Sequence, residues 1–357
     1  MDKERLELYT DYLISQQKYA TATGLSHILE GHISHDAITR FLSEDEYGSK
    51  QLWQYVKPLV RQQEHLDDGV LSFDDTIEEK PYTDENELVC WHFSHTHNRN
   101  IKGINILTAL VSYGDINFPV GYELVKKELR YCDLSTKKER RCSSVTKNEQ
   151  FRDLLKQCIE NDLCFKYVLA DSWFACTDNM KYIHGDLDRY FIFALKSNRL
   201  VALNGEAKKH ARYENVSSVA FKENEVIVCF LKDYLYPVAL CKKVFKNEDG
   251  SEGILYLVTN DLTLSADGTV ELYKKRWRIE EYHKSIKENV SLAKSPTRTL
   301  RTQSNHIFAV MVGYCKLEAL KIKMKLNHFA IRYKLLLKAN QIAMQELKAM
   351  QRCYGVT

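Results

Sequence analysis

Residues 273–287 read Tyr-Lys-Lys-Arg-Trp-Arg-Ile-Glu-Glu-Tyr-His-Lys-Ser-Ile-Lys, and this stretch guides our interpretation of the whole chain. Its apolar residues recur at helical spacing, which predicts a helix with one apolar stripe packed on a core. At about 100° per residue, Tyr273, Arg276, Glu280 and Lys287 share one narrow face. One carboxylate, one phenol and two cations on a face suit metal-assisted phosphodiester chemistry. A surface helix with salt bridges at i,i+4 spacing is the alternative.

The composition narrows the class of protein. The 357 residues suffice for two or three domains, and 44% hydrophobic residues can bury a sizeable core. No apolar run is long enough to cross a bilayer, so we expect no membrane partner. The N-terminal residues lack the apolar segment of a secretion signal. The ten cysteines include no Cys-x-x-Cys pair, which favours free thiols in a reducing cytoplasm over disulfides or a zinc site.

Charge is unevenly distributed along the chain, although the net charge is only +3. Residues 1–100 hold nine Lys and Arg against 19 Asp and Glu. Residues 302–357 hold nine against two, and residues 273–301 hold nine against three. This basic C-terminal third predicts a polyanionic partner, most simply nucleic acid. A solvated basic helix face is the other interpretation of the same composition.

Periodicity predicts three domains. Residues 1–66 contain apolar positions at helical spacing, and Ser34 is a suitable N-cap for one of the helices. This region is either a helix-turn-helix-like unit or a small helical interaction domain. Residues 67–302 alternate between strand and helix patterns and form the predicted catalytic domain. Residues 303–357 predict two basic helices.

Three consecutive strands open the middle domain, and β-α-β units with a closing helix follow. We expect strands at 70–76, 101–113, 118–125, 167–170 and 190–195, and helices at 149–160, 176–184 and 270–289. A charged loop is expected at 137–141. This order predicts an α/β fold, with a mixed sheet covered by flanking helices, that resembles the ribonuclease H-like fold. Residues 198–263 predict a β-rich insertion, with strands at 216–221, 225–231, 236–244 and 254–258.

Two apolar strands end in acidic residues. The first reads Val-Leu-Ser-Phe-Asp-Asp-Thr from Val70, and the second reads Tyr-Val-Leu-Ala-Asp-Ser-Trp from Tyr167. Asp is a poor strand former, so each acid is either a turn or cap residue or part of a site. Clustered carboxylates repel one another unless a cation neutralises them, and all-oxygen ligands select Mg²⁺ or Mn²⁺. Strand alternation leaves both Asp74 and Asp75 as candidates for the first acid.

The spacing Tyr273-x₂-Arg276-x₃-Glu280-x₆-Lys287 resembles the Tyr-Arg-Glu-Lys signature of DDE transposases of the insertion sequence 4 type. Asp-Asp-Thr at 74–76 is similar to the first acidic motif of that family, and its Asp-x-Thr spacing favours Asp74. Leu-Ala-Asp-Ser around Asp171 is similar to the second motif. A β insertion before the final helix is a further similarity.

The resemblance implies a catalytic role for Asp74, Asp171 and Glu280, which would bind two Mg²⁺ ions that Mn²⁺ can replace. It also implies that Tyr273, Arg276 and Lys287 contact DNA phosphates. Arg298 and Arg301 lie just after the closing helix, which makes them two further candidates for DNA contacts.

The family further implies cut-and-paste DNA transposition, a form of DNA recombination by a mobile element. The endonuclease would cut at the terminal inverted repeats, expose 3′-hydroxyls and join them to target DNA. We expect a homodimer on paired ends in the bacterial cytoplasm, associated with the nucleoid. One alternative is a ribonuclease H-like DNA nuclease that cuts without joining. The other is a non-catalytic DNA-binding protein derived from a transposase.

Overall fold

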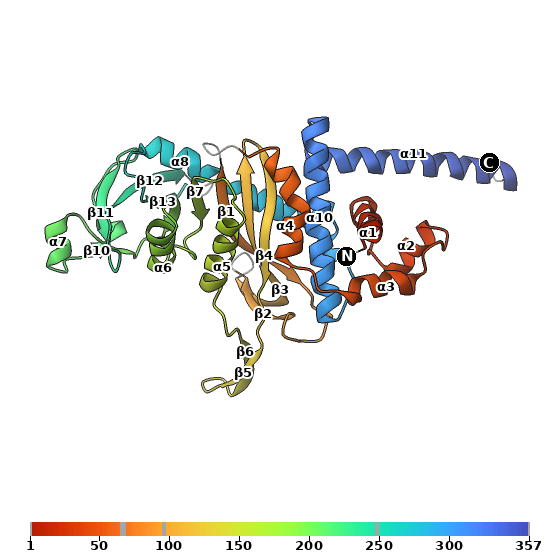
Figure 1. Ribbon diagram of the computed structural model, residues 1–357, viewed down its shortest axis with the longest axis horizontal. Coiled ribbons are helices and arrows are strands. Elements are labelled where there is room, and N and C mark those ends of the chain that lie inside the picture. Colours follow the sequence, from red (N-terminus) through yellow and green to blue (C-terminus); the bar gives the residue numbers. More distant parts are fainter. Residues whose placement is uncertain (1, 65–68, 95–97, 247–249, 356–357) are drawn as a thin grey trace. The chain divides into compact units, whose positions relative to one another are not determined.

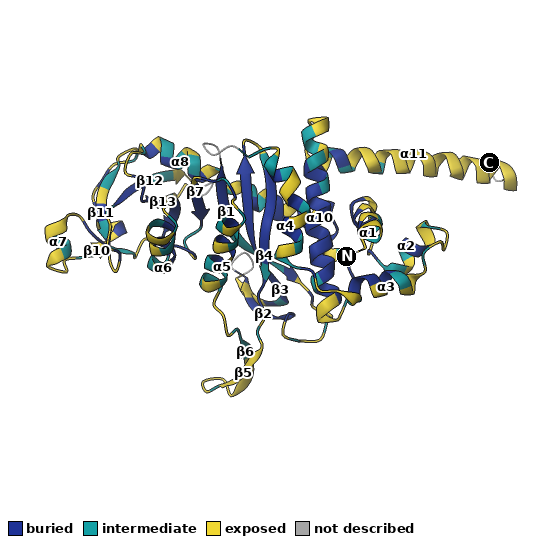
Figure 2. Ribbon diagram, in the orientation of Figure 1, coloured by how far each residue is buried: buried dark blue, intermediate teal, exposed yellow. Residues whose placement is uncertain are grey.

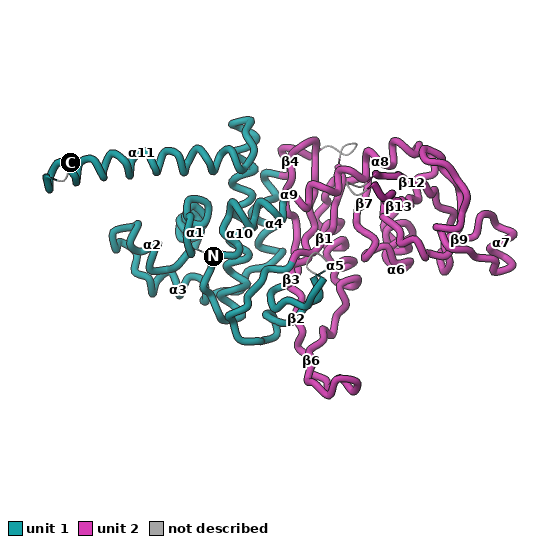
Figure 3. Tube along the Cα trace, turned by 180° about the vertical axis from the view of Figure 1, so that it is seen from behind, with its two compact units in different colours: residues 1–59, 77–104, 282–357 teal, residues 60–76, 105–281 magenta. Residues whose placement is uncertain are grey.

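The computed structural model describes residues 2–64, 69–94, 98–246 and 250–355. The chain divides into two compact units, coloured separately in Figure 3. Unit 1 comprises residues 1–59, 77–104 and 282–357, and unit 2 comprises residues 60–76 and 105–281. The expected boundary between residues 66 and 67 lies outside the described residues. The expected domains 1–66, 67–302 and 303–357 therefore stay a prediction.

The sheet of unit 2 has the predicted mixed topology (Figure 1). Its central strands are β1 (Val70–Glu79), β3 (Arg99–Tyr113), β4 (Ile116–Leu124), β7 (Tyr167–Ala170) and β8 (Tyr190–Leu195). They lie in the order β4–β3–β1–β7–β8, and the ends of β1 and β3 continue into unit 1. Strands β1, β7 and β8 are parallel, whereas β3 and β4 are antiparallel. Three consecutive strands followed by parallel β-α-β units give the ribonuclease H-like fold that the sequence predicts.

Helices cover this sheet at the predicted places. Helix α5 (Lys147–Glu160) starts with a capping box in which Thr146 and Glu149 satisfy each other's backbone N–H groups. Its buried Phe151 packs against Phe73 of β1, with 4.3 Å between the ring centroids. Helix α6 (Thr177–Lys181) continues into a π-helical turn, η1 (Tyr182–Asp186), and leads to β8. The expected helices at 149–160 and 176–184 are thus confirmed.

The β-rich insertion extends the same sheet rather than forming a separate one. Its strands are β9 (Leu200–Ala202), β10 (Glu214–Asn215), β11 (Ile227–Leu231), β12 (Val238–Lys246) and β13 (Glu252–Thr259), with α7 (Gly205–Lys209) between β9 and β10. From β8 outward the order is β13–β12–β11–β9–β10. The expected strand at 216–221 is wrong. A short 3₁₀ helix, η2 (Val216–Ser218), occupies that stretch, because the N–H of Val219 donates back to the Val216 carbonyl.

The closing helix is divided in two, contrary to the expectation of one helix over 270–289. Helix α8 (Ala266–Lys274) ends before a turn at Lys275 and Arg276, and α9 (Trp277–Asn289) follows. Hydrogen bonds three residues apart tighten this turn: the N–H of Arg276 donates to the Tyr273 carbonyl at 2.9 Å. Helical periodicity does not reveal such a turn, because apolar residues on both sides keep their spacing.

Unit 1 is mainly helical, as expected for both ends of the chain. Its helices are α1 (Lys3–Ser15), α2 (Ala22–Ile28), α3 (His35–Glu44), α4 (Ser49–Arg61), α10 (Leu300–Met324) and α11 (His328–Tyr354), with α4 ending in unit 2. A short 3₁₀ helix, η3 (Leu292–Lys294), precedes α10, and β2 (Cys90–Ser94) pairs with the start of β3. Ser34 caps α3 as predicted, by accepting a hydrogen bond from the N–H of Ala37. Helix α10 is mostly buried, whereas α11 is mostly exposed (Figure 2).

A β-hairpin replaces the charged loop expected at 137–141. Strands β5 (Leu129–Asp133) and β6 (Lys138–Cys142) pair only with each other in the described part of the chain. Their side chains are largely exposed and polar, so no apolar alternation marks them in the sequence. Elsewhere, no described helix is both long and apolar enough to cross a membrane.

Candidate active site

Asp74 and Asp171 lie next to each other because of the register between β1 and β7, although β1 continues past Asp74 to Glu79 and only β7 ends before its aspartate, contrary to the expectation of two strand ends. Phe73 pairs with Ala170 in the parallel ladder, and the next residue on each strand is an aspartate. Asp74 and Asp171 therefore lie side by side where the pairing of these two adjacent strands ends. The carboxyl ends of parallel strands are where open α/β sheets usually bind ligands.

Asp74 carries the electrostatic signature of a crowded carboxylate. Burial, and then the neighbouring charges of Asp171 and Asp75, raise the pKa of Asp74 from 3.8 to about 7. The Arg276 guanidinium acts in the opposite direction and lowers this pKa. A buried carboxyl with acidic neighbours favours the protonated form unless a cation compensates the negative charge. The site therefore has too few cations to keep Asp74 ionised.

Asp75 is held by partners of its own. Its Oδ1 pairs with the Lys147 Nζ at 2.9 Å, and its Oδ2 accepts a hydrogen bond from the Asn105 side chain. Asp75 is therefore neutralised on one side of β1, while Asp74 lies with Asp171 and Arg276. This geometry favours Asp74 over Asp75 as the first acid of the site.

Arg276 joins the third carboxylate to the first. Its Nη2 lies 2.5 Å from the Glu280 Oε1, and its Nη1 lies 3.8 Å from the Asp74 Oδ2. Glu280 is in the first turn of α9, and Arg276 is in the turn between α8 and α9. The broken helix thus places a guanidinium between two of the three predicted carboxylates.

Tyr273 anchors the end of α8 to the sheet. It belongs to a buried cluster with Val70 of β1 and Leu169 of β7. Burial is the main cause that raises the pKa of Tyr273 to about 12, so the phenol keeps its proton at neutral pH. The Arg276 guanidinium lies 5.5 Å from the centre of its ring, which favours a cation–π contact. Tyr273, Arg276 and Glu280 are therefore close to the strand-end acids within unit 2.

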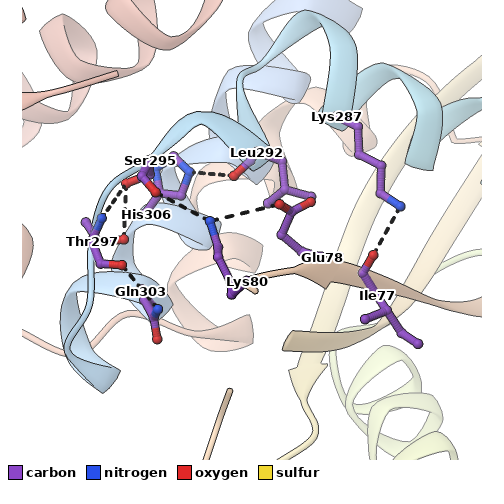
Figure 4. A network of polar contacts seen from close by, with 9 residues as sticks. All are labelled: Ile77, Glu78, Lys80, Lys287, Leu292, Ser295, Thr297, Gln303 and His306. Carbon is purple, nitrogen blue, oxygen red and sulfur yellow. Dashed lines mark hydrogen bonds and ion pairs between the residues drawn. The ribbon is translucent and has the colours of Figure 1, made fainter. Parts of the chain in front are cut away.

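The other predicted DNA contacts lie in unit 1. Lys287 of α9 donates a hydrogen bond to the Ile77 carbonyl at 3.3 Å, as Figure 4 shows. The next residue of β1 in that network, Glu78, is buried and pairs with Lys80 at 3.9 Å. Arg298 and Arg301 are exposed, and Arg298 lines a pocket of about 270 Å³ beside the start of α10.

The sequence did not predict the cluster that Trp173, Lys147 and Lys196 form beside Asp171. Trp173, two residues after Asp171, is 47% exposed, and its backbone N–H donates to the Asp171 carboxylate at 2.9 Å. The Nζ atoms of Lys147 and Lys196 lie 4.7 Å and 6.0 Å from the centre of its ring. The signal in the sequence is a large aromatic residue two positions after a strand-end acid, in Asp-Ser-Trp.

The three predicted carboxylates have the chemistry of a divalent-cation site but not its compact geometry. Among the residues that the structure describes, no three His, Cys, Asp or Glu side chains converge closely enough to hold a metal ion. The chemistry of the donors nevertheless fits one. Asp74, Asp171 and Glu280 offer only carboxylate oxygens, which hard cations prefer. The raised pKa of Asp74 and the Arg276 bridge both indicate a place where positive charge is needed.

Comparisons with known proteins agree with this arrangement. The family model described as transposase DDE domain matches residues 135–315. The family model described as DDE superfamily endonuclease matches residues 2–215. Each match covers at least half of the chain, and together they include all three carboxylates. A comparison with curated proteins gave no match.

Proposed function

The chain belongs to the family of DDE transposases and endonucleases, and from this premise we propose that it cuts DNA at insertion-sequence ends and joins them to target DNA. Membership makes it a transposase-type nuclease that acts on DNA, in a superfamily that generally uses divalent metal ions. Joining, a cut-and-paste route and relationship to the insertion sequence 4 type are our proposal. They rest on the Tyr273, Arg276, Glu280 and Lys287 spacing.

One observation carries the proposal. The register between β1 and β7 sets Asp74 beside Asp171, and Arg276 links Asp74 to Glu280. A fold gains no stability from acidic neighbours that raise the pKa of a buried carboxyl such as Asp74, so a function that needs them is the simplest explanation.

We assign the catalytic and metal-binding roles to Asp74, Asp171 and Glu280. Two Mg²⁺ ions, or Mn²⁺ in their place, would supply an activated water and neutralise the leaving oxygen at phosphorus. Asp74 and Asp171 hold their carboxylates at one sheet edge, so little reorganisation is needed there. Glu280, which contacts Arg276 in this structure, would hold a cation only with that contact released.

Arg276 gains a partner when that contact is released. A DNA phosphate accepts two hydrogen bonds from a guanidinium in the same geometry as a carboxylate does. We propose that Arg276 moves its hydrogen bonds from Glu280 to a phosphate near the cleaved bond. Tyr273 would hold the guanidinium in place through the cation–π contact. Lys287, Arg298 and Arg301 would contact other phosphates, each as a salt-dependent contribution to affinity.

The wider assembly follows from the same proposal. Residues 1–66 would read the terminal inverted repeats or contribute dimer contacts, residues 67–302 would catalyse, and residues 303–357 would form a basic helical region. A homodimer would hold two element ends together before they join one target DNA. Such an enzyme would work in the bacterial cytoplasm on nucleoid DNA.

The test is cleavage and joining of a labelled duplex that carries the ends of the encoding element, with Mg²⁺. Glu280→Gln keeps the size of the side chain and removes the charge, while Glu281→Gln changes an exposed neighbour on the same helix as a matched control. We expect Glu280→Gln to bind DNA without cutting it and Glu281→Gln to cut normally. Equal cutting by both variants would contradict the site. Cutting without joining of 3′-hydroxyl ends would indicate a nuclease, and binding without any cutting by the native chain a DNA-binding protein.

A further inference from the structure

Helix α11 is long, amphipathic and largely uncovered. Of its 27 residues, only His328 and Ile331 are buried, and both are in its first turns. The rest of the helix carries large apolar side chains that are between 40% and 82% exposed. Figure 2 shows this exposure along nearly its whole length. An isolated helix gains little stability from its own hydrogen bonds. A helix with so much exposed apolar surface is therefore expected to pack against a partner.

Side-chain contacts hold the N-terminal end of α11 within unit 1. The His328 Nε2 lies 2.8 Å from the buried Glu318 carboxylate of α10, and its Nδ1 shares a hydrogen bond with the Ser285 hydroxyl of α9. Lys321 pairs with the same Glu318 at 2.9 Å. Farther along, Arg332 donates a hydrogen bond to the Gln16 carbonyl. These contacts fix where the helix starts and leave the residues after Arg332 available.

The exposed part has a heptad pattern. Residues spaced alternately four and three apart form one stripe, and most of them are apolar. At about 100° per residue, this stripe covers about 100° of the helix surface. We call it the seam, and its members are Phe329, Tyr333, Leu336, Asn340, Ala343, Leu347, Met350 and Tyr354.

The polar residues gather opposite the seam. Between Tyr333 and Tyr354, positions b and f of the same heptads hold only amide or cationic side chains. These are Lys334, Lys338, Gln341, Gln345, Lys348 and Arg352. A partner on the seam would therefore meet none of these cations. Among the flanking e and g positions only Arg332 and Glu346 are charged, so a second copy of the helix could approach without like-charge repulsion.

Asn340 points to the nature of the partner. It is the one polar residue of the seam and occupies a central a position. Facing an apolar partner, its amide would lose hydrogen bonds to water and gain none. In a parallel pair of identical helices, a-position residues meet each other, so two Asn340 amides can bond together. A single Asn at an a position is the best-attested device for fixing register and two-strandedness.

We propose that α11 pairs with α11 of a second copy of this chain as a parallel two-stranded coiled coil along the seam. The proposal deepens the suggested homodimer by naming its surface, but it needs neither DNA nor a metal. Residues Phe329–Tyr354 span between three and four heptads, which is enough for a stable pair. Gly355, in a left-handed conformation, ends the helix just after the last seam residue.

The first experiment is sedimentation of the full-length chain at micromolar concentration without DNA or metal. Leu347→Lys places a charge in the seam, and Ile342→Lys makes the same change on another face. The two side chains are matched in exposure, at 56% and 55%. We expect the native chain and Ile342→Lys to be dimeric. Leu347→Lys should weaken the dimer about 100-fold or more, the loss typical of a central interface residue, with an unchanged circular dichroism spectrum.

The second experiment tests the parallel register. Leu347→Cys and Ile342→Cys are made in a chain whose exposed Cys132 and Cys353 are replaced by Ser. Under mild oxidation, Leu347→Cys should form a disulfide between copies and Ile342→Cys should not. Disulfides at neither position, or equally at both, would overturn the parallel seam.

Other outcomes overturn the proposal as clearly. A monomeric native chain would do so, and its binding to anionic phospholipid vesicles would assign the apolar face to a lipid surface instead. Dissociation of both lysine variants, or of neither, would exclude the seam as the interface. These readings are independent of the proposed chemistry: a dimer that never cuts DNA contradicts the enzyme, and a monomer that cuts contradicts the coiled coil.

Discussion

Two of the four acids on strand β1, Asp74 and Glu78, lie four residues apart in different electrostatic surroundings. Glu78 in unit 1 is buried, and burial raises its pKa, but Lys80 and Lys287 lower it again (Figure 4). Asp74 in unit 2 is surrounded mainly by other carboxylates, which raise its pKa further. Matched charges are typical of a structural ion pair, whereas an excess of like charge is typical of a site that binds a ligand of opposite charge.

The excess can be counted from the contacts around Asp74. These contacts link four acids, Asp74, Asp75, Asp171 and Glu280, and include two cations, Arg276 and Lys147. The acids therefore outnumber the cations, which favours the binding of a divalent cation. The comparison predicts that changes at Asp74 affect chemistry and changes at Glu78 affect stability.

The largest expected effect is on cleavage. Asp74→Asn should lower the single-turnover rate of DNA cutting by at least about 10⁴-fold, or roughly 5 kcal/mol of transition-state stabilisation. Glu78→Gln should leave the rate of the folded fraction nearly unchanged. Asp75→Asn separates the two candidates for the first acid. If it abolished cutting while Asp74→Asn retained it, the assignment would be wrong.

The second effect is on stability and falls on the other acid. Glu78→Gln leaves the buried Lys80 ammonium without its carboxylate, which should reduce the free energy of unfolding by about 3–5 kcal/mol. Urea denaturation measures this loss. Adding Lys80→Met should recover most of it, because both charges are then gone. A loss of unfolding free energy below about 1 kcal/mol, within the range of an exposed ion pair, would show that Glu78 has no structural role.

The third effect is a pH dependence of the metal-free protein. Asp74 has a folded-state pKa of about 7 against an ordinary value of 3.8, so between these values the folded state binds more protons than the unfolded state. Its contribution to stability is therefore present at low pH and lost as the pH rises through this window. We expect a fall on the order of 2 kcal/mol in urea denaturation. Asp74→Asn should remove it.

Saturating Mg²⁺ or Mn²⁺ provides the control for that pH dependence. A cation that binds the ionised carboxylates should restore stability above pH 7 in the native chain and restore less in Asp74→Asn. Stability that rises with pH between 4 and 7 in both proteins would show that other groups dominate.

The smallest expected effect concerns Arg276. Because its guanidinium already contacts Glu280 and Asp74, Arg276→Gln should raise the affinity of the DNA-free protein for Mn²⁺, by about tenfold or 1.4 kcal/mol. Electron paramagnetic resonance of free Mn²⁺ measures this affinity. The same variant should bind DNA more weakly. An unchanged or lower Mn²⁺ affinity would mean that Arg276 does not compete with the cation.

Much of the site follows from the sequence because two of its acids directly follow apolar runs. The runs before Asp74 and Asp171 predict buried strands, and parallel neighbours must deliver their ends to one edge of the sheet. The spacing of Tyr273, Arg276 and Glu280 likewise predicts their proximity. These inferences use only period and position, which a single sequence contains.

Other features depend on contacts between distant residues, so the sequence does not reveal them. The turn at Lys275 and Arg276 leaves the helical spacing intact and is therefore invisible to periodicity. The Lys147 contact with Asp75 joins residues 72 positions apart. The hairpin of β5 and β6 lacks apolar alternation because no core lies beneath it.

The most direct test of the central claim is metal-specific rescue of Asp171→Cys. A thiolate is a poor ligand for Mg²⁺ and a better one for the softer Mn²⁺. If Asp171 binds the catalytic ion, the variant should not cut DNA with Mg²⁺ and should regain part of its activity with Mn²⁺, while Asp171→Ala regains none. Equal activity of Asp171→Cys with both metals, or no rescue by Mn²⁺ in a folded variant that still binds DNA, would contradict the carboxylate site.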